Sequence, residues 1–520
     1  MLDKGVESTD RMARHASDSA MSTSSPALTT QQSHATSSAR TAGVAKALSS
    51  VVVLVADGLR HDDLVGAIAR DDVPTLAQLR SEGGLHCITT AFPSVTGVAY
   101  APFLVGRHPG SVGIPGLRWY DRSRRISRLR GHSRSYVGIE FREVDRDLDA
   151  TQPTMFELAR PSLGALSVIA RGLPRKARIG GSVGFAARAG WTHFRGDVEG
   201  WLSIDRDIAD RAIDRIARER PRYAFVALTG IDKTSHAAGC DAPAVLKALQ
   251  TVDATARRIR EDAERDGRWE GMHIWIVSDH GHSPVGAHDD IAALLRSLGW
   301  PVLAHPWTFS TRRRASAKVA VMVSGNAMAH LYLDLARRER AFWPALSSQW
   351  SALVDALLER RSIDLVVLPH GDGKVAIHSR DRGSAIIESL GKWHSYRPQS
   401  GDPLGLGDAA EHGVTEEEAH EITLHSDYPD ALVQTARIAA CARSGDVVLS
   451  AARGWDFRGR YEPIPHVSSH GALHRDHMLV PLLVNRVTRS IPRRTVDLMP
   501  SALDALGIVC PPEVEGTSFL

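Results

Sequence analysis

Three apolar runs, each followed closely by an aspartate, constrain the fold of this chain more than any other feature. They read SVVVLVADG, YAFVALTGID and MHIWIVSDHGH, and the aspartates are Asp57, Asp232 and Asp279. Runs rich in apolar and β-branched residues without polar alternation are typical of strands buried on both faces of a parallel sheet. Because the carboxyl ends of such strands border one crevice, the three carboxylates are predicted to converge on one site.

Helical segments separate these runs. Residues 73–84, 204–221 and 243–267 show helical periodicity and end at glycine or proline. Alternating strands and helices predict an α/β fold, with a doubly wound, mostly parallel sheet flanked by helices, whose first part covers residues 48–310. The second part is expected over 446–520, with the main sheet resuming at GDVVLSAARG and closing with HMLVPLLVNR and a helix in 495–508.

Two regions depart from this alternation. Residues 1–47 are rich in Ser, Thr and Ala, a composition that buries too little apolar surface to offset ordering entropy, so a disordered tail is predicted. Residues 311–445 combine a helix over 342–361, short strands and a Gly/Pro/Asp-rich loop over 397–413. This segment is predicted to be an inserted, smaller α+β cap subdomain.

Composition excludes several classes of protein. The formal net charge of +3 gives no global field that would recruit a nucleic acid polymer. The four cysteines form no C-x-x-C pair, which argues against a disulfide framework or a thiolate zinc site. We expect no membrane span and no secretory leader, and hence a cytoplasmic protein, because no apolar run has the required length. The oligomeric state is left open.

Histidines accompany the three aspartates. His236 follows Asp232 by four residues, His280 is next to Asp279, and the late segment SSHGALHRDH contributes His470. Taken singly, Asp57-Gly58 would be a turn and His470 a surface or core histidine. Together they are the carboxylate and imidazole ligands that Zn²⁺ takes, and that Mn²⁺ also accepts. Six such residues suffice for two divalent metal ions, an arrangement used for displacement at phosphorus.

The stretch AFPSVTGVAYAPFLVGRHPG places Thr96 just before an apolar run that is predicted to be helical. A threonine in this position is either a helix cap or a nucleophile whose hydroxyl is activated by a metal ion. The two interpretations are compatible, because a helix start would also offer backbone N–H groups to a phosphate.

In these residues the chain resembles the alkaline phosphatase superfamily, most closely its nucleotide pyrophosphatase/phosphodiesterase branch, over residues 48–310 and 445–520. The resemblance rests on DG at 57–58, Thr96 with the glycines and proline that follow it, D-x-x-x-H at 232–236, SDHG at 278–281 and the late HG at 470–471. It implies hydrolysis of phosphate esters or phosphoanhydrides through a phosphothreonine on Thr96. It further implies one ion held by Asp57, Thr96, Asp279 and His280, and a second held by Asp232, His236 and His470.

The sequence departs from the diesterase pattern in two places. Leu117 stands where that branch carries a phosphate-binding asparagine, and GVAY follows the nucleophile. Arg118, the first arginine of a basic run over 118–134, is predicted to act as the phosphate clamp instead, because guanidinium binds phosphate oxygens in a bidentate manner; the alternative is a solvated basic face. The expected partner is a phosphorylated small molecule, with nucleotides among the candidates.

Other activities stay open on the same residues. A phosphomonoesterase or a phosphonate hydrolase would use the same site, a metal-dependent phosphoglycerate mutase is a lesser option, and a non-catalytic, metal-stabilised binding protein would keep the ligands without turnover. The sulfatase nucleophile context is absent around Thr96.

Overall fold

The computed structural model describes residues 49–123, 133–305, 316–459 and 464–520. Residues Ala47–Leu520 make one compact unit. The predicted disordered tail lies outside the described residues, as does most of the basic run that begins at Arg118.

The main sheet has seven strands in the order β2-β21-β8-β1-β7-β5-β6. All its strands point the same way except β21, which is antiparallel to both of its neighbours. The three predicted apolar runs form the centre of this sheet as β1, β7 and β8, which confirms a mostly parallel α/β fold. Its strands are β1 (Ser50–Ala56), β2 (Gly84–Thr89), β5 (Ser162–Ala165), β6 (Arg178–Ile179), β7 (Tyr223–Leu228), β8 (Met272–Val277) and β21 (Leu479–Val484).

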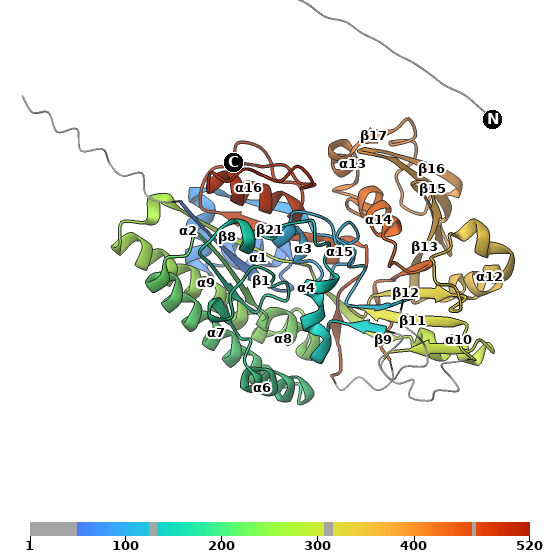
Figure 1. Ribbon diagram of the computed structural model, residues 1–520, viewed down its shortest axis with the longest axis horizontal. Coiled ribbons are helices and arrows are strands. Elements are labelled where there is room, and N and C mark those ends of the chain that lie inside the picture. Colours follow the sequence, from blue (N-terminus) through green and yellow to red (C-terminus); the bar gives the residue numbers. More distant parts are fainter. Residues whose placement is uncertain (1–48, 124–132, 306–315, 460–463) are drawn as a thin grey trace, which may run out of the picture. The chain divides into compact units, whose positions relative to one another are not determined.

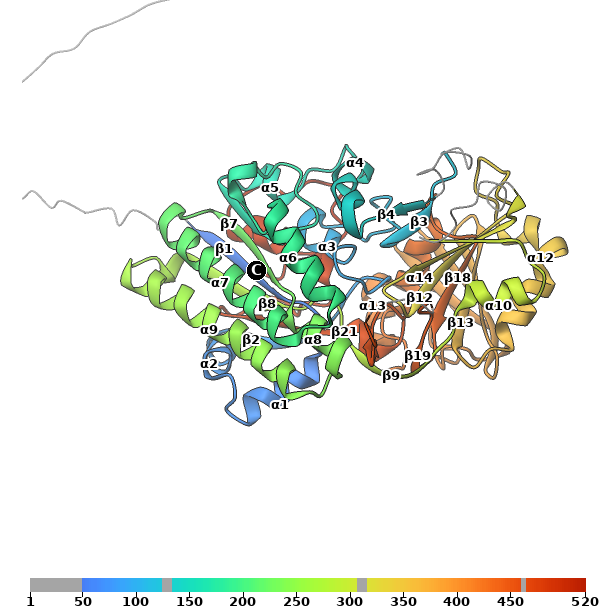
Figure 2. The ribbon, with the colours of Figure 1, turned by 90° about the horizontal axis from the view of Figure 1, so that it is seen from below.

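Helices cover both faces of the main sheet (Figures 1 and 2). Alternate residues of β1 point to opposite sides, so that Val52 and Leu54 pack with α1, α2, α7 and α9, whereas Val51 and Val53 pack with α3, α5 and α16. These helices are α1 (His61–Ala69), α2 (Pro74–Glu82), α3 (Ala101–Val105), α5 (Met155–Leu158), α7 (Val198–Glu219), α9 (Pro243–Arg265) and α16 (Leu498–Ala505).

A second sheet has nine strands in the order β10-β11-β12-β18-β13-β14-β15-β16-β17. Helices α10 (Ile291–Ser297) and α12 (Trp343–Leu358) pack on one face, and α13 (Glu416–Thr423) and α14 (Ala431–Ala440) on the other. The strands are β10 (Val302–Ala304), β11 (Val319–Ser324), β12 (Met328–Leu333), β13 (Ile363–Gly371), β14 (Lys374–Ser379), β15 (Gly383–Leu390), β16 (Trp393–Gly401), β17 (Val414–Thr415) and β18 (Val447–Ala451).

The prediction that the main sheet resumes at GDVVLSAARG was wrong. That run forms β18, which pairs with β12 and β13 in the second sheet. The main sheet resumes only at β21. An apolar run buried on both faces looks the same in either sheet, so its pattern does not tell which partner it joins. The second sheet also begins at β10, before residue 311.

Shorter elements connect the two sheets. A three-stranded sheet joins β9 (Ser283–His288), β19 (Gly454–Asp456) and β20 (Ser468–Ser469), and a two-stranded sheet joins β3 (Arg118–Tyr120) and β4 (Ser133–Ser135). In the described part of the chain, no helix is both long and apolar enough to cross a bilayer. The remaining elements are η1 (Gly138–Glu143), α4 (Val144–Asp147), η2 (Arg175–Ala177), α6 (Val183–Phe194), α8 (Gly230–Ala238), η3 (Trp269–Gly271), α15 (Arg475–Met478) and η4 (Thr495–Asp497).

Candidate active site

The carboxyl ends of β1, β7 and β8 bring the predicted acids together. Asp57 follows β1 directly, and Asp279 lies two residues beyond β8. Asp232 is in the first turn of α8, which begins two residues after β7, and His236 lies one turn later on the same helix. Gly58 has a positive φ of 84°, and a Cβ there would lie 3.1 Å from Asp232 Cα. Glycine therefore lets the β1 loop approach α8 closely.

Thr96 lies against this cluster. Its hydroxyl donates to Asp57 Oδ1 at 3.1 Å and lies 2.9 Å from His280 Nε2. Thr96 is half-buried, whereas the three aspartates and His280 are buried. The structure thus places the predicted nucleophile between two of its predicted metal ligands.

The helix expected to start at Thr96 begins instead at Ala101 and has only five residues. Thr96 itself opens a turn in which the N–H of Ala99 bonds to the carbonyl oxygen of Val95 at 2.9 Å. Gly97 in this turn has a positive φ of 81°, and Pro102 is found within the first turn of the helix. The expected helix start at the hydroxyl is therefore absent from this loop, and Thr96 is not a helix cap.

Three histidines are held at Nδ1 by backbone carbonyls, with their Nε2 atoms directed toward the acids of the cluster. The Nδ1 atoms of His236, His280 and His470 lie 2.8 to 3.0 Å from the carbonyl oxygens of Ser468, Gly281 and Ser94. A carbonyl oxygen only accepts, so each Nδ1 carries a proton, and in the neutral form of each ring the lone pair is on Nε2, where a metal ion could bind. Two of these atoms, those of His236 and His470, lie 3.2 and 3.4 Å from Asp232 Oδ1.

His282 differs from these three, and sequence reasoning left it out. Its Nε2 lies 2.8 Å from Asp232 Oδ1, and its Nδ1 lies 2.6 Å from the hydroxyl of Ser468. A hydroxyl can donate, so His282 can keep its proton on Nε2 and donate it to Asp232. We infer that His282 orients Asp232. The spacing of His282 two residues after His280 was the sequence signal for it.

The second sheet reaches this cluster through the turn between β11 and β12. A Cβ on Gly325 would lie 2.4 Å from Val95, and the N–H of Ala327 bonds to the carbonyl oxygen of His470 at 3.1 Å. Asn326, also in the turn, lies 3.0 Å from His466 Nδ1, which is 3.0 Å from His236 Nδ1. Nothing in the sequence pattern singled out Asn326 or His466, because only the fold brings them to His236.

Unsatisfied oxygens mark the site as one for cations. Both carboxylate oxygens of Asp279 and Oδ2 of Asp57 are buried without a hydrogen-bond partner among the described residues. Burial and the charge of Asp57 hold the pKa of Asp279 well above its usual range. In contrast, Lys233 and His236 hold the pKa of Asp232 well below it despite its burial. Buried acids without partners are rare, and a bound cation is a common reason for them.

Two groups of side chains could each hold an ion. Asp57, Asp279 and His280 form one, and Asp232, His280, His282 and His470 form the other, with ligand atoms inside each group lying within 4.8 Å of one another. The oxygen and nitrogen donors fit zinc or manganese. The first group contains three of the four ligands expected for one ion, the fourth being Thr96. The second shares Asp232 and His470 with the set expected for the other ion, but it has His280 and His282 in place of His236.

Arg118 belongs to a different sheet from the ligand-bearing strands. It begins β3 and lies opposite Ser135 of β4. The preceding N–H, of Leu117, donates to the hydroxyl of Ser324 at 2.7 Å, and Ser324 is next to the Gly325 turn that packs on Val95. Residues 124–132 of the same basic run lie outside the described residues.

A model of the type I phosphodiesterase/nucleotide pyrophosphatase family matches residues 51–476, which include all six predicted metal ligands and Thr96. The chain belongs to this family. It is therefore a hydrolase of phosphoester or phosphoanhydride bonds, from a family whose members depend on metal ions. A search of curated proteins found no match.

Solved structures share the fold of this phosphodiesterase-family chain at low identity. Phosphonoacetate hydrolase from Sinorhizobium meliloti 1021, in complex with phosphonoformate, is 16% identical, with a TM-score of 0.52 over 88% of this chain and 96% of that one. Murine ectonucleotide pyrophosphatase/phosphodiesterase 5, as an inactive variant with AMP, is 13% identical, with a TM-score of 0.51 over 89% and 96%. The human protein is 12% identical, with a TM-score of 0.53 over 90% and 97%.

The role assigned to His282 in this phosphodiesterase-family site predicts a graded effect on metal binding. We expect His282→Ala to weaken zinc binding by about tenfold or more, because Asp232 loses its donor. His282→Gln should weaken it less, since a glutamine amide can replace Nε2 as a donor. Competition with a chromophoric chelator measures both affinities. Equal zinc affinities for His282→Ala and wild type would contradict the orienting role.

Asp205 on α7 fixes the start of α8, which carries Asp232. Its two oxygens accept hydrogen bonds from the N–H groups of Thr229 and Gly230 at 2.9 and 2.7 Å. Burial raises the pKa of Asp205 to about 7, well above the usual range of an aspartate. The carboxyl group of Asp205 therefore binds its proton more tightly in the folded protein than in the unfolded chain. The contribution of this protonated group to the free energy of unfolding is fully present below about pH 4 and is lost as the pH rises through 7.

This pKa predicts a pH-dependent slope in stability. Between pH 5 and 7 the free energy of unfolding should fall by up to about 1.4 kcal/mol per pH unit more in the wild type than in Asp205→Asn. Urea unfolding across this range measures the difference. Asp210→Asn, at a solvent-facing position of α7, is the control and should keep the wild-type slope. If the free energy of unfolding depended on pH in the same way in the wild type and in Asp205→Asn, the raised pKa of Asp205 would be ruled out.

Proposed function

We propose that this chain hydrolyses phosphodiesters or nucleotide-type phosphoanhydrides through a phosphothreonine on Thr96, assisted by two divalent metal ions, with zinc preferred and manganese as the alternative. The observation that carries the proposal is the position of the Thr96 hydroxyl between Asp57 Oδ1 and His280 Nε2, beside the unpartnered oxygens of Asp279. Ions held there would lower the pKa of the hydroxyl and offset negative charge on the phosphoryl group.

The chain's own groups suit a two-step displacement. The Thr96 hydroxyl releases its proton to solvent, and Oγ1 forms a bond to phosphorus as the bond from phosphorus to the leaving oxygen breaks; the leaving group departs with that electron pair. Asp57 and His280 hold the hydroxyl in place for attack. Water then forms the next bond to phosphorus, the Thr96 ester bond breaks, and the hydroxyl recovers a proton. The product is a phosphate monoester or inorganic phosphate, according to the substrate.

Substrate choice is tested by a panel run with metal analysis on the same sample. The panel contains aryl phosphate monoesters and diesters, nucleotide anhydrides, nucleotide sugars and phosphonates. Fastest hydrolysis of diesters or nucleotide anhydrides supports the proposal. A preference for monoesters or phosphonates would assign the alternative activities to the same site. Failure of the metal-loaded protein to hydrolyse any member would favour a metal-stabilised binding protein.

Arg118 is proposed as the phosphate clamp in place of the asparagine of the diesterase branch. The contact of Leu117 with Ser324, next to the turn that packs on Val95, supports a position near the nucleophile loop. Arg118→Ala is expected to raise KM by about tenfold with a smaller change in kcat, because a bidentate phosphate contact is lost. Steady-state kinetics on the preferred substrate measure this. An unchanged kcat/KM would mean that Arg118 does not bind the phosphate and belongs to a solvated basic face.

A further inference from the structure

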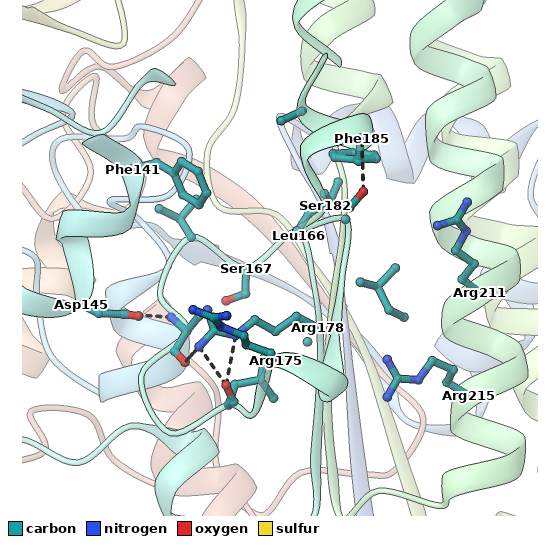
Figure 3. Close-up of a pocket in the computed structure, with 18 of the residues that line it drawn as sticks. Phe141, Asp145, Leu166, Ser167, Arg175, Arg178, Ser182, Phe185, Arg211 and Arg215 are labelled. Carbon is teal, nitrogen blue, oxygen red and sulfur yellow. Dashed lines mark hydrogen bonds between the residues drawn. The ribbon is translucent and has the colours of Figure 1, made fainter. Parts of the chain in front are cut away.

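A cavity of about 940 Å³ lies along β6, the edge strand of the main sheet, and is not part of the metal-ligand cluster. Strand β6, the loop after β5, η2, the start of α6 and one side of α7 form its walls. Figure 3 shows Arg175 and Arg178 in the cavity, with Arg211 and Arg215 extending from α7 on the opposite side. We propose that this arginine cleft binds a phosphorylated organic molecule with an aromatic body.

The lining of the arginine cleft carries excess positive charge. Two carboxylates, those of Asp145 and Asp214, also line it. Two more pair with lining arginines of α7, Glu219 with Arg215 at 2.7 Å and Asp207 with Arg211 at 3.4 Å. Five arginines therefore face four carboxylates. Asp145 Oδ1 accepts bonds from the N–H groups of Ala170 and Arg171 at 2.8 and 3.0 Å, so backbone donors occupy it. An anion is the ligand that this balance favours, and guanidinium groups are suited to phosphate. The arginines that line the cleft are Arg175, Arg178, Arg211, Arg215 and Arg218.

Arg178 is held in place by neutral partners. Its Nε donates to the carbonyl oxygen of Leu173 at 3.0 Å, and its Nη2 donates to those of Leu173 and Ala170 at 2.8 and 3.0 Å. Backbone carbonyls orient the guanidinium but carry no formal charge to neutralise it. The Nη1 atom takes no part in these three bonds and keeps two N–H donors. A preorganised cation of this kind loses little conformational entropy when it binds an anion.

Apolar side chains line the same cavity. Leu166 and Val168 come from the loop after β5, and Phe141 and Phe185 come from η1 and α6. Figure 3 shows both phenylalanine rings at the upper end of the view and the arginines below them. A free phosphate would use only the arginines, whereas a ligand with an aromatic body would bury these side chains as well. The cavity is large enough for a nucleotide-sized molecule.

The arginine cleft borders the nucleophile loop at Val168. A Cβ built on Gly97, the residue after Thr96, would lie 3.0 Å from Val168 Cγ2. The loop of Val168 follows β5, which runs parallel to β7 and so leaves the sheet at the edge where the metal ligands converge. A ligand in the cleft would thus lie on the far side of Val168 from the Thr96 loop.

The test uses AMP as the probe, with inorganic phosphate and adenosine as its two halves. Calorimetry is done on the full chain in excess chelator, so that turnover and metal-mediated binding are both suppressed. We expect AMP to bind with a Kd below about 1 mM and more tightly than either half. Arg175→Ala combined with Arg211→Ala should weaken AMP binding about tenfold or more. Arg257→Ala, at an exposed arginine of α9 that pairs with Glu261 and does not line the cleft, is the matched control.

A second variant tests the apolar side chains. Phe185→Ala should weaken AMP binding and leave phosphate binding unchanged, whereas the double arginine variant should weaken both. Circular dichroism shows whether each variant folds. No AMP binding, or equal binding by wild type and the double arginine variant, would overturn the proposal. Equal affinities for AMP and phosphate would overturn the aromatic part. Because the protein is metal-free throughout, none of these results depends on the proposed hydrolysis.

Discussion

Thr96→Ala is expected to lower kcat/KM for phosphoester hydrolysis on the order of 10³-fold or more, with metal content close to wild type. The hydroxyl of Thr96 lies within hydrogen-bond distance of both Asp57 and His280, and alanine leaves nothing there to attack phosphorus. Asp57, Asp279 and His280 still provide carboxylate and imidazole ligands. Hydrolysis of a chromogenic aryl diester, with metal analysis of the same protein, measures both quantities.

Thr96→Ser is the matched variant, because it keeps the hydroxyl and removes only a methyl group. We expect it to keep most of the activity that alanine loses. Acid quenching during turnover, followed by mass spectrometry of the peptide, should find phosphate on residue 96 in the wild type and not in Thr96→Ala. Wild-type turnover by Thr96→Ala with its metal bound would mean that water attacks phosphorus directly.

Asp279→Asn is expected to reverse its effect on stability according to whether metal is present. In excess chelator the variant should be more stable than the wild type by about 1 to 4 kcal/mol, because it removes a buried acid that lies beside the like charge of Asp57 and whose oxygens have no hydrogen-bond partner among the described residues. With zinc at about 1,000 times the Kd, the wild type should gain about 4 kcal/mol that the variant largely loses, because metal binds only the folded state. Urea unfolding in chelator and in zinc measures both.

Asp214→Asn separates this effect from a simple change of net charge. This variant removes one negative charge from an exposed position of α7. Its free energy of unfolding should stay close to that of the wild type both in chelator and in zinc. Metal analysis should find about one equivalent fewer in Asp279→Asn. If the variant were less stable than the wild type in chelator and still bound the full complement, Asp279 would not be a metal ligand.

Local pattern was sufficient for much of the fold. The apolar runs of β1, β7 and β8 predict central parallel strands, because strands buried on both faces lack polar residues. Since parallel strands end at the same edge of a sheet, Asp57, Asp232 and Asp279 are then expected at one edge. The apolar pattern of β18 did not predict its sheet, because the hydrogen-bond partners of a strand are set by tertiary packing and not by the sequence of the strand. Local pattern also failed at Thr96, where a turn precedes the short helix.

Contacts made through the fold explain what sequence reasoning missed at the site. His282 looked like a neighbour of a ligand, and only the distances to Asp232 and Ser468 give it a role. His466 and Asn326 reach His236 from segments 140 residues apart, with nothing in their local sequence to connect them. The arginines of α7 carried no signal in the sequence beyond helical periodicity, and only the fold brings β6 and the loop after β5 to face them across the cleft.

The strand β18 has a consequence for anyone who builds chimeras of this enzyme. Deleting residues 311–445 as a separate subdomain would remove β12 and β13, the two strands that pair with β18. Both edges of β18 would then lack hydrogen-bond partners, and such exposed edges promote aggregation. The deletion would also remove the Gly325 turn that packs on Val95. Cut points that respect the hydrogen bonding lie before β10 and after β18, so recombination should exchange the second sheet as a whole.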